Sequence, residues 1–430
     1  MNRRKALTLS LTGIVATGAL ALTGCAAGDG AGADEGSGSQ KVVYVVPSSW
    51  AQTGAFADNV TAWEKKSGNT VEVQAIPDEQ YDDTVRARLQ GGEGIDIYAG
   101  QDNVDDPSAI MREVDESAFA DRMAESVLES MRAADGKIYG YPAADGLSSF
   151  GVIYNKDVYE TAGAAAPKTL EEFTASLEKV KAEGTTPLYL SGADGWTLLQ
   201  HRNSVNANLL GQDPELAEKL AANETTWGGV SEMKPQYTAL AEWASAGLTN
   251  SDVLTAKYET AIKSVADGSA AAIINGSWAI GEIRKANPDA NIGFFALPTT
   301  TGENQIALSR PNILHIAAAS KVEDAAADLL QFLITPENVA AHLAAAPGIP
   351  AFTDVELDNP DTAIADIQAY VENGQSGPAF DTATGFPTPE SELIAAYQEL
   401  VGGRIDAAGF VKKVDAAWQG AGKTAGIKGF

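Results

Sequence analysis

Cysteine is almost absent from the chain, since its 430 residues include only Cys25. A single cysteine excludes a disulfide framework, so a large hydrophobic core has to stabilise the fold. Hydrophobic residues make up 44% of the chain and charged residues 20%, which is typical of packed globular proteins rather than of disordered ones. At about 150 residues per domain, this length predicts two domains.

Basic residues are also scarce. Lysine and arginine together number 30, against 58 aspartates and glutamates, which gives a formal net charge of −28 at pH 7. A field of this sign repels the phosphates of nucleic acids and of anionic lipids. We therefore expect no nucleic-acid partner, and a neutral ligand fits the charge balance best.

The motifs of common enzymes and metal sites are missing from the sequence. The three histidines, His201, His315 and His342, stand apart from one another and from cysteine, so they lack metal-ligand spacing. Ser176–Lys179 matches the S-x-x-K motif, but it falls inside an amphipathic helix pattern, where a chance match is expected. The acidic run Asp102–Asp106 lacks the glycine and the distal glutamate of a calcium loop. We expect a binding protein without cofactor, metal or catalytic residues.

Long hydrophobic runs are limited to one, near the N-terminus. Met1–Lys5 is basic and Ala6–Leu22 is apolar, and no later run approaches the roughly 20 residues that span a bilayer. A basic segment followed by an apolar core is typical of a secretory signal peptide. The sequence Leu-Thr-Gly-Cys at Leu22–Cys25 resembles the lipoprotein box of bacteria. This resemblance implies cleavage before Cys25 and attachment of lipid to it.

These N-terminal features predict how the protein is held at the cell surface. Residues 1–24 form the expected signal peptide. Residues 25–40, rich in glycine, alanine, serine and acidic residues, form a lipidated and flexible tether. We therefore expect a lipid-anchored protein on the extracytoplasmic face of the cell membrane.

From Lys41 onward, strand patterns alternate with helix patterns. The predicted strands are residues 42–46, 71–76, 95–99, 150–154, 187–190, 270–274 and 292–297. The predicted helices include residues 56–66, 78–90, 170–183, 257–266, 278–285 and 325–334, with a further helix from Pro336. The first five elements follow a βαβαβ order, which predicts a parallel or mixed sheet covered by helices.

Aromatic residues offer the clearest binding chemistry. The chain has seven tryptophans, and Trp50, Trp196 and Trp278 each follow a strand pattern or lie in a turn. A flat indole suits the apolar face of a pyranose, and neighbouring polar side chains can bond to its hydroxyl groups. Trp63 and Trp243 fall on helix patterns, so we expect both in the core. For Trp50 and Trp196, core packing and ligand contact are equally open.

Five short motifs occur in order over nearly the whole chain after the tether. They are GKIYGYP at 136–142, IYNKD at 153–157, PKTLEEF at 167–173, AIINGSW at 272–278 and IGFFALP at 292–298. Together they resemble the extracellular solute-binding proteins that feed carbohydrate ABC importers. The resemblance implies an α/β fold of the two-lobed periplasmic-binding-protein type II class, with a ligand cleft at the hinge between lobes. The lobes it implies are residues 41–147 with about 303–355, and residues 148–302 with about 356–430.

The same resemblance implies a set of ligand contacts. Trp278 matches the family's sugar-stacking tryptophan. Asp194 and Trp196 align with an acid–proline–aromatic triplet of the cleft, in which glycine here replaces proline. Asp102 and Asn103 fall where the first lobe offers polar groups after its third strand.

Four further positions complete the predicted contacts. Asp145 lies in the crossover to the second lobe, where an acid often faces the sugar. Arg310 departs from a small-residue pattern, which makes it a candidate for a ligand-specific contact. Phe386 is the nearest substitute for the last aromatic residue of the cleft, and Trp50 follows the first strand.

These observations predict a monomeric binding protein. It would enclose a neutral mono- or oligosaccharide by hinge closure and deliver it to the permease subunits of an ABC transporter. Two alternatives stay open at this point. A cell-surface glycosidase or lyase needs paired carboxylates, which Asp145 and Asp194 could supply. A binder of another solute, such as a polyamine, a peptide or a metal, also fits the acidic composition.

Overall fold

The structure is a computed structural model that describes residues 39–92, 94–100, 104, 106–380, 384 and 386–430. The predicted signal peptide, Cys25, Asp102 and Asn103 lie outside the described residues. Strands and helices alternate along much of the described chain, so the predicted α/β class is confirmed. Among the described helices, none combines the length and the apolar character that a membrane span requires.

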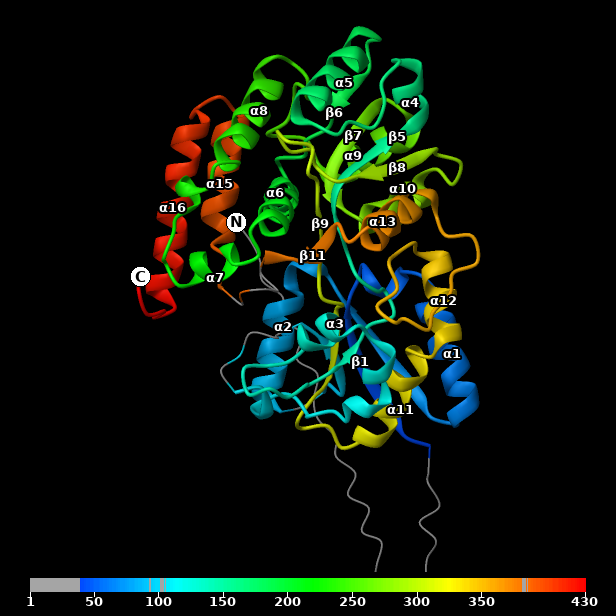
Figure 1. Cartoon of the computed structure of the whole chain (residues 1–430). Helices are drawn as coiled ribbons and strands as arrows, with labels where there is room; N and C mark the ends of the chain where they lie inside the picture. The colour runs from blue at the N-terminus through cyan, green and yellow to red at the C-terminus, as the bar shows by residue number, and fades with distance from the viewer. Residues whose placement is uncertain (1–38, 93, 101–103, 105, 381–383, 385) are drawn as a thin grey trace, which may run out of the picture. The chain divides into compact units, whose positions relative to one another are not determined.

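The first sheet has five strands in the order β2-β1-β3-β10-β4 (Figure 1). Their bounds are β1 Lys41–Pro47, β2 Thr70–Ile76, β3 Ile97–Ala99, β4 Tyr141–Pro142 and β10 Ile313–Ile316. Strand β1 pairs in parallel with β2 and β3, whereas β10 is antiparallel to β3 and β4. Four of the seven residues of β1 are buried, as expected for a strand that lies inside a largely parallel sheet.

Helices from both halves of the chain belong with this first sheet. They are α1 Phe56–Ser67, α2 Asp78–Gly91, α3 Glu125–Glu129, α11 Glu323–Leu333 and α12 Pro336–Ala345. Helix α1 lies beside α11 although the two are far apart in the sequence (Figure 1). The indole N–H of Trp63 on α1 donates to Asp328 on α11 over 2.7 Å, so a buried tryptophan links the two helices.

The second sheet has four strands in the order β6-β7-β5-β8. Their bounds are β5 Phe150–Asn155, β6 Thr186–Leu188, β7 Ala270–Gly276 and β8 Ile292–Phe295. Strand β5 is antiparallel to β7 and β8, and β6 is parallel to β7. Every residue of β7 is buried, so this strand forms the centre of the second core.

Ten helices of the described chain belong with the second sheet or extend its core (Figure 1). They are α4 Lys156–Thr161, α5 Leu170–Ala182, α6 Leu199–Gln212, α7 Leu216–Ala221, α8 Met233–Ser245, α9 Tyr258–Asp267, α10 Trp278–Ala286, α13 Thr362–Glu372, α15 Glu390–Val401 and α16 Ala407–Thr424. Thr169 and Glu172 form the capping box that begins α5. Gly268 ends α9 in the left-handed conformation, which explains why the helix stops there.

Three segments, here called the crossover segments, run between elements of the two sheets. They are residues 143–149, 309–312 and 346–352. Backbone bonds join them side by side: Leu147 N–H donates to Ile349 over 2.8 Å, and Ser309 N–H donates to Ser148 over 2.8 Å. Short strands β9 Ile306–Leu308 and β11 Ser376–Pro378 pair in parallel next to them. The lobe boundaries near residues 147, 302 and 355 stay a prediction.

Candidate functional site

Trp278 stands at the junction of β7 and α10, where the sequence Asn275-Gly276-Ser277 turns the chain from strand to helix. A β-carbon at position 276 would lie only 2.0 to 2.4 Å from three indole carbons of Trp278. The indole therefore packs directly over the backbone of Gly276. Phe150, the strand partner of Gly276, meets the indole edge to face at 5.8 Å. Glycine at 276 and phenylalanine at 150 thus fix the position of the ring.

Two more aromatic side chains lie beside Trp278. The ring centroid of Trp196 is 6.3 Å from that of Trp278 and 4.9 Å from that of Tyr258. Trp196 lies in the 3-10 helix Gly195–Leu198 and stays 38% exposed, whereas Tyr258 begins α9. We call Phe150, Trp196, Tyr258 and Trp278 the aromatic cluster. The structure thus brings together Trp196 and Trp278, two of the predicted contacts.

Asp194 holds this cluster together. Its carboxylate accepts a hydrogen bond from the backbone N–H of Tyr258 over 2.7 Å, at the end of α9 that favours negative charge. Its backbone carbonyl accepts from Thr197 over 2.9 Å. A β-carbon at Gly195 would lie 2.3 Å from Ile394, so no other residue fits there without movement. This close approach favours glycine at position 195.

Sequence reasoning missed Tyr258 and Glu282. The hydroxyl of Tyr258 is buried, and the side chains of Glu282 and Trp278 lie within its reach. Glu282 lies beside this hydroxyl, and burial together with the Glu282 carboxylate raises the pKa of Tyr258. Burial also raises the pKa of Glu282. Helical spacing places Glu282 one turn after Trp278, which is the signal that could have identified it.

Asp145 occupies one crossover segment and is joined to another. The side-chain amide of Asn312 donates to one carboxylate oxygen of Asp145 over 2.5 Å. The other oxygen, Oδ1, is buried and has no hydrogen-bond partner in the part of the chain that the structure describes. Burial raises the pKa of Asp145 to about 6. Arg310 lies half-buried in the same crossover segment as Asn312.

The remaining predicted contacts lie elsewhere. Trp50 is half-buried and packs against the hydrophobic core that includes Trp63. Phe386 is 5% exposed and stacks on Trp418, with ring centroids 3.7 Å apart. A ring buried in this way has no free face for a ligand, so the proposed site excludes Phe386. Trp63 and Trp243 are buried, which confirms the prediction that they belong to the core.

The histidines and carboxylates of the described residues form no metal centre. No group of three or more histidine, cysteine, aspartate or glutamate side chains in this part of the chain could hold a metal ion. His201 and His342 are buried, and burial lowers the pKa of His201 to about 3 and that of His342 to about 4. Both are therefore neutral at physiological pH.

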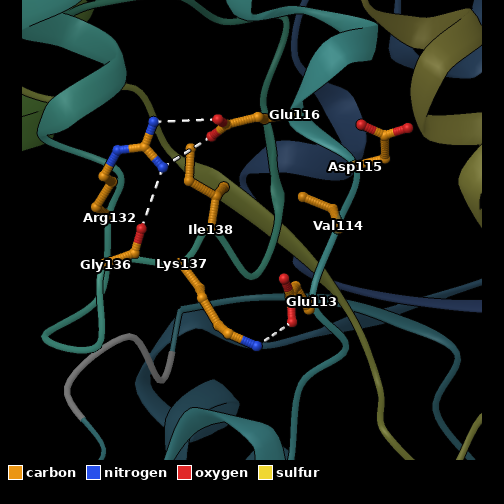
Figure 2. A pocket seen from close by; sticks show the side chains of 8 residues that line it. All are labelled: Glu113, Val114, Asp115, Glu116, Arg132, Gly136, Lys137 and Ile138. Carbon is orange, nitrogen blue, oxygen red and sulfur yellow. Dashed lines mark hydrogen bonds and ion pairs between the residues drawn. The ribbon is translucent and has the colours of Figure 1, made fainter.

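A surface hollow of about 710 Å³ lies apart from the aromatic cluster, among residues 113–138. Its two cations are already paired, as Figure 2 shows: Arg132 contacts Glu116 at 2.8 Å, and Lys137 pairs with Glu113. The Arg132 guanidinium also donates to the backbone carbonyl of Gly136 over 3.1 Å. The hollow is lined by none of the predicted contact residues.

Comparison with known proteins gives relatives and structural neighbours. The melibiose/raffinose/stachyose-binding protein MelE of Bacillus subtilis is 24% identical over 79% of this chain and 80% of its own length. The multiple sugar-binding protein of Streptococcus mutans is 28% identical, but the match covers 46% of this chain and 48% of that protein.

Two solved structures have a similar fold. A chitin oligosaccharide binding protein has a TM-score of 0.73 and 23% identity, with 90% of this chain and 99% of that chain covered. RafE in complex with raffinose has a TM-score of 0.73 and 19% identity. The match covers 89% of this chain and 99% of RafE. These neighbours confirm the two-lobed periplasmic-binding-protein fold that the five motifs predicted. The model of the family described as bacterial extracellular solute-binding protein matches residues 58–373, and the chain therefore belongs to that family.

Proposed function

We propose that this protein binds an oligosaccharide at the aromatic cluster and delivers it to the permease of an ABC importer. The observation that carries the proposal is the pair of indoles, Trp196 and Trp278, that lie side by side with Trp196 38% exposed. MelE, RafE and the chitin oligosaccharide binding protein are all named for sugars, which supports the same ligand class here.

The spacing of the two indoles supports an oligosaccharide. Their ring centroids are 6.3 Å apart and their planes are inclined by 43°. A sugar ring held between two aromatic faces needs a separation of roughly 7 to 8 Å, because each contact takes about 3.5 to 4 Å. The indoles are therefore too close to hold one sugar between them. They form one continuous surface, over which neighbouring sugar units can lie.

The polar groups around this surface supply the specificity. Asp145 has a buried carboxylate oxygen that lacks a partner among the described residues, and Arg310 lies in the neighbouring crossover segment. The proposal retains three further ligand contacts predicted from the sequence, namely Asp102, Asn103 and Trp50. Closure of the lobes would bring these groups and the indoles onto one ligand. The ligand leaves unchanged, since the proposal includes no chemical step.

The proposal also includes the location of the protein. Cys25 carries lipid after removal of residues 1–24, and the tether of residues 25–40 keeps the monomer close to its permease. Several acyl chains are needed for a stable anchor, because a single chain binds a membrane only marginally.

Thermal unfolding with a panel of mono- and oligosaccharides tests the proposal. A sugar present at 100 times its dissociation constant adds about 2.7 kcal/mol to the free energy of unfolding, which raises the melting temperature. Trp278→Ala is expected to remove this shift, because a central stacked aromatic contributes roughly 2 kcal/mol or more. Val371→Ala, at a site 39% exposed on α13, is the matched control and should keep the shift. Unchanged affinity of the Trp278→Ala protein in calorimetry would exclude the site.

A cationic solute such as a polyamine is the second candidate. The net charge of −28 and the carboxylate of Glu282 beside the aromatic cluster favour it. Aromatic rings also bind ammonium groups through their faces. The two candidates differ in how salt changes the affinity, because only the polyamine is attracted by charge.

A further inference from the structure

Two serines outside the predicted contacts make the same pair of hydrogen bonds to neighbouring residues of the chain. The backbone N–H of Ser277 donates to the carbonyl of Ser149 over 2.8 Å, and the hydroxyl oxygen of Ser277 accepts from the backbone N–H of Ser149 over 3.0 Å. Ser309 bonds to Ser148 in the same way and over the same two distances. We call the dipeptide Ser148-Ser149, together with Ser277 and Ser309, the serine junction.

The serine junction lies between two predicted ligand contacts. Ser277 directly precedes Trp278, and Ser309 directly precedes Arg310. Successive residues of an extended chain direct their N–H and C=O groups to opposite sides, so Ser277 and Ser309 flank the dipeptide. One dipeptide of a crossover segment therefore fixes how far the stacking indole lies from the segment that carries Arg310.

The hydroxyl oxygen of Ser277 is hard to replace. Ser149 is 0% exposed and Ser277 is 2% exposed, so water has no access to a broken bond between them. Alanine at position 277 would leave the backbone N–H of Ser149 buried without an acceptor, which is destabilising. The turn that carries Trp278 would then take up alternative positions. Only the fraction of molecules in the original position would bind as before.

We propose that Ser277 and Ser309 are positioning residues, which hold Trp278 and the Arg310 segment at a fixed spacing on either side of the dipeptide. Neither serine needs to touch the ligand. This inference rests on the proposed function and adds to it the residues that set the geometry of the site. Because this geometry exists before the sugar arrives, no binding free energy is lost in forming it.

The first sheet offers a matched control. Ser320 is 4% exposed, and its hydroxyl oxygen accepts from the backbone N–H of Val322 over 3.2 Å. The same hydroxyl donates to Asp96 over 2.6 Å. Ser277→Ala and Ser320→Ala therefore remove the same kind of buried acceptor, one in the serine junction and one just before α11.

The experiment compares the full chain with its Ser277→Ala, Ser309→Ala and Ser320→Ala variants. Raffinose and stachyose are titrated into each protein by calorimetry, and thermal unfolding without sugar is recorded in parallel. We expect Ser277→Ala to bind about ten-fold more weakly, which corresponds to the loss of one buried hydrogen bond. Ser309 is half-buried, so water partly replaces its hydroxyl, and Ser309→Ala should bind about three-fold more weakly.

A spectroscopic measurement separates positioning from a general loss of stability. The indole N–H signal of Trp278 is recorded without sugar in proton–nitrogen correlation spectra and is identified by its absence in Trp278→Phe. Ser277→Ala and Ser309→Ala should both shift or broaden this signal, although Ser309 bonds to the opposite side of the dipeptide. Ser320→Ala should lower the melting temperature but leave the Trp278 signal and the sugar affinity unchanged.

The results distinguish the inference from the proposed function. A Trp278 signal that stays in place in both Ser277→Ala and Ser309→Ala would overturn the inference, whatever their melting temperatures, and so would an unchanged sugar affinity. If Ser277→Ala does not fold, Ser309→Ala decides by the same two measurements. A wild type that binds no sugar would overturn the proposed function, whereas the Trp278 signal would still test the positioning.

Discussion

Single residues fix the candidate site in ways that follow from simple physical chemistry. Trp278 packs over Gly276, where any side chain would collide with the indole. The sequence alone predicts Asn275-Gly276-Ser277 as a turn that begins a helix. Tyr258 and Glu282 could not be predicted in the same way, because their significance depends on a contact between two helices. Sequence periodicity reports which face of a helix is apolar, but not which neighbouring helix that face meets.

Asp145 should make the stability of the protein depend on pH. Burial raises its pKa to about 6, whereas an aspartate in an unfolded chain has a pKa of about 3.9. Between these values the folded protein holds a proton that the unfolded chain has released. The free energy of unfolding therefore falls as pH rises from about 4 to about 6. Asp145→Asn removes this effect and should raise the free energy of unfolding at pH 7 by roughly 3 kcal/mol.

Urea unfolding of the wild type and of Asp145→Asn at several pH values measures the effect. The difference between the two proteins isolates Asp145, because the buried His201 and His342 titrate in both. The difference should be largest above pH 6 and disappear near pH 4. A difference that is the same at every pH would contradict a buried, ionised Asp145.

At the scale of elements, the sequence predicts a strand where its apolar run is uninterrupted. The predicted strands at residues 42–46, 150–154 and 270–274 are found as β1, β5 and β7. Strand β10 escapes prediction, because His315 interrupts its short apolar pattern. The pairing of β10 with β3 joins Leu314 to Ala99, and nothing in either local sequence identifies the other. Local pattern thus predicts an element, whereas its partner depends on the tertiary fold.

The close packing of two crossover segments, residues 143–149 and 346–352, requires a glycine at position 146. Gly146 has φ of +77°, and a β-carbon there would lie 2.0 Å from the carbonyl oxygen of Ile349. Gly146→Ala is expected to lower the free energy of unfolding by roughly 3 kcal/mol or more, since left-handed strain costs about 1 to 2 kcal/mol and overpacking about 1 to 3. Urea unfolding measures the loss.

Gly163→Ala separates the two causes of that loss. Gly163 has φ of +60°, but a β-carbon there would meet no atom within 4 Å, so alanine should cost only the strain of about 1 to 2 kcal/mol. If the two variants lose the same free energy of unfolding, the contact between Gly146 and Ile349 adds nothing to the cost of Gly146→Ala.

For the whole molecule, the net charge of −28 makes salt a useful probe. Self-repulsion destabilises the compact state, and raising ionic strength from about 0.01 M to about 0.15 M shortens the Debye length from about 30 Å to about 8 Å. We expect the melting temperature to rise over this range. The affinity for a neutral sugar should stay constant, whereas the affinity for a polyamine should fall. Calorimetry at both salt concentrations distinguishes the two, and a sugar affinity that falls with salt would contradict binding of a neutral ligand.

The position of β10 in the first sheet has a consequence for how the protein is made. Strand β10 lies between β3 and β4, so the sheet cannot be completed until a segment far along the chain has left the ribosome. Roughly 200 residues separate β3 from β10, which takes about 10 to 40 s at 5 to 20 residues per second. During this time the first sheet lacks β10, the strand that joins β3 to β4. The complete five-stranded sheet can therefore form only after residues 313–316 have been synthesised.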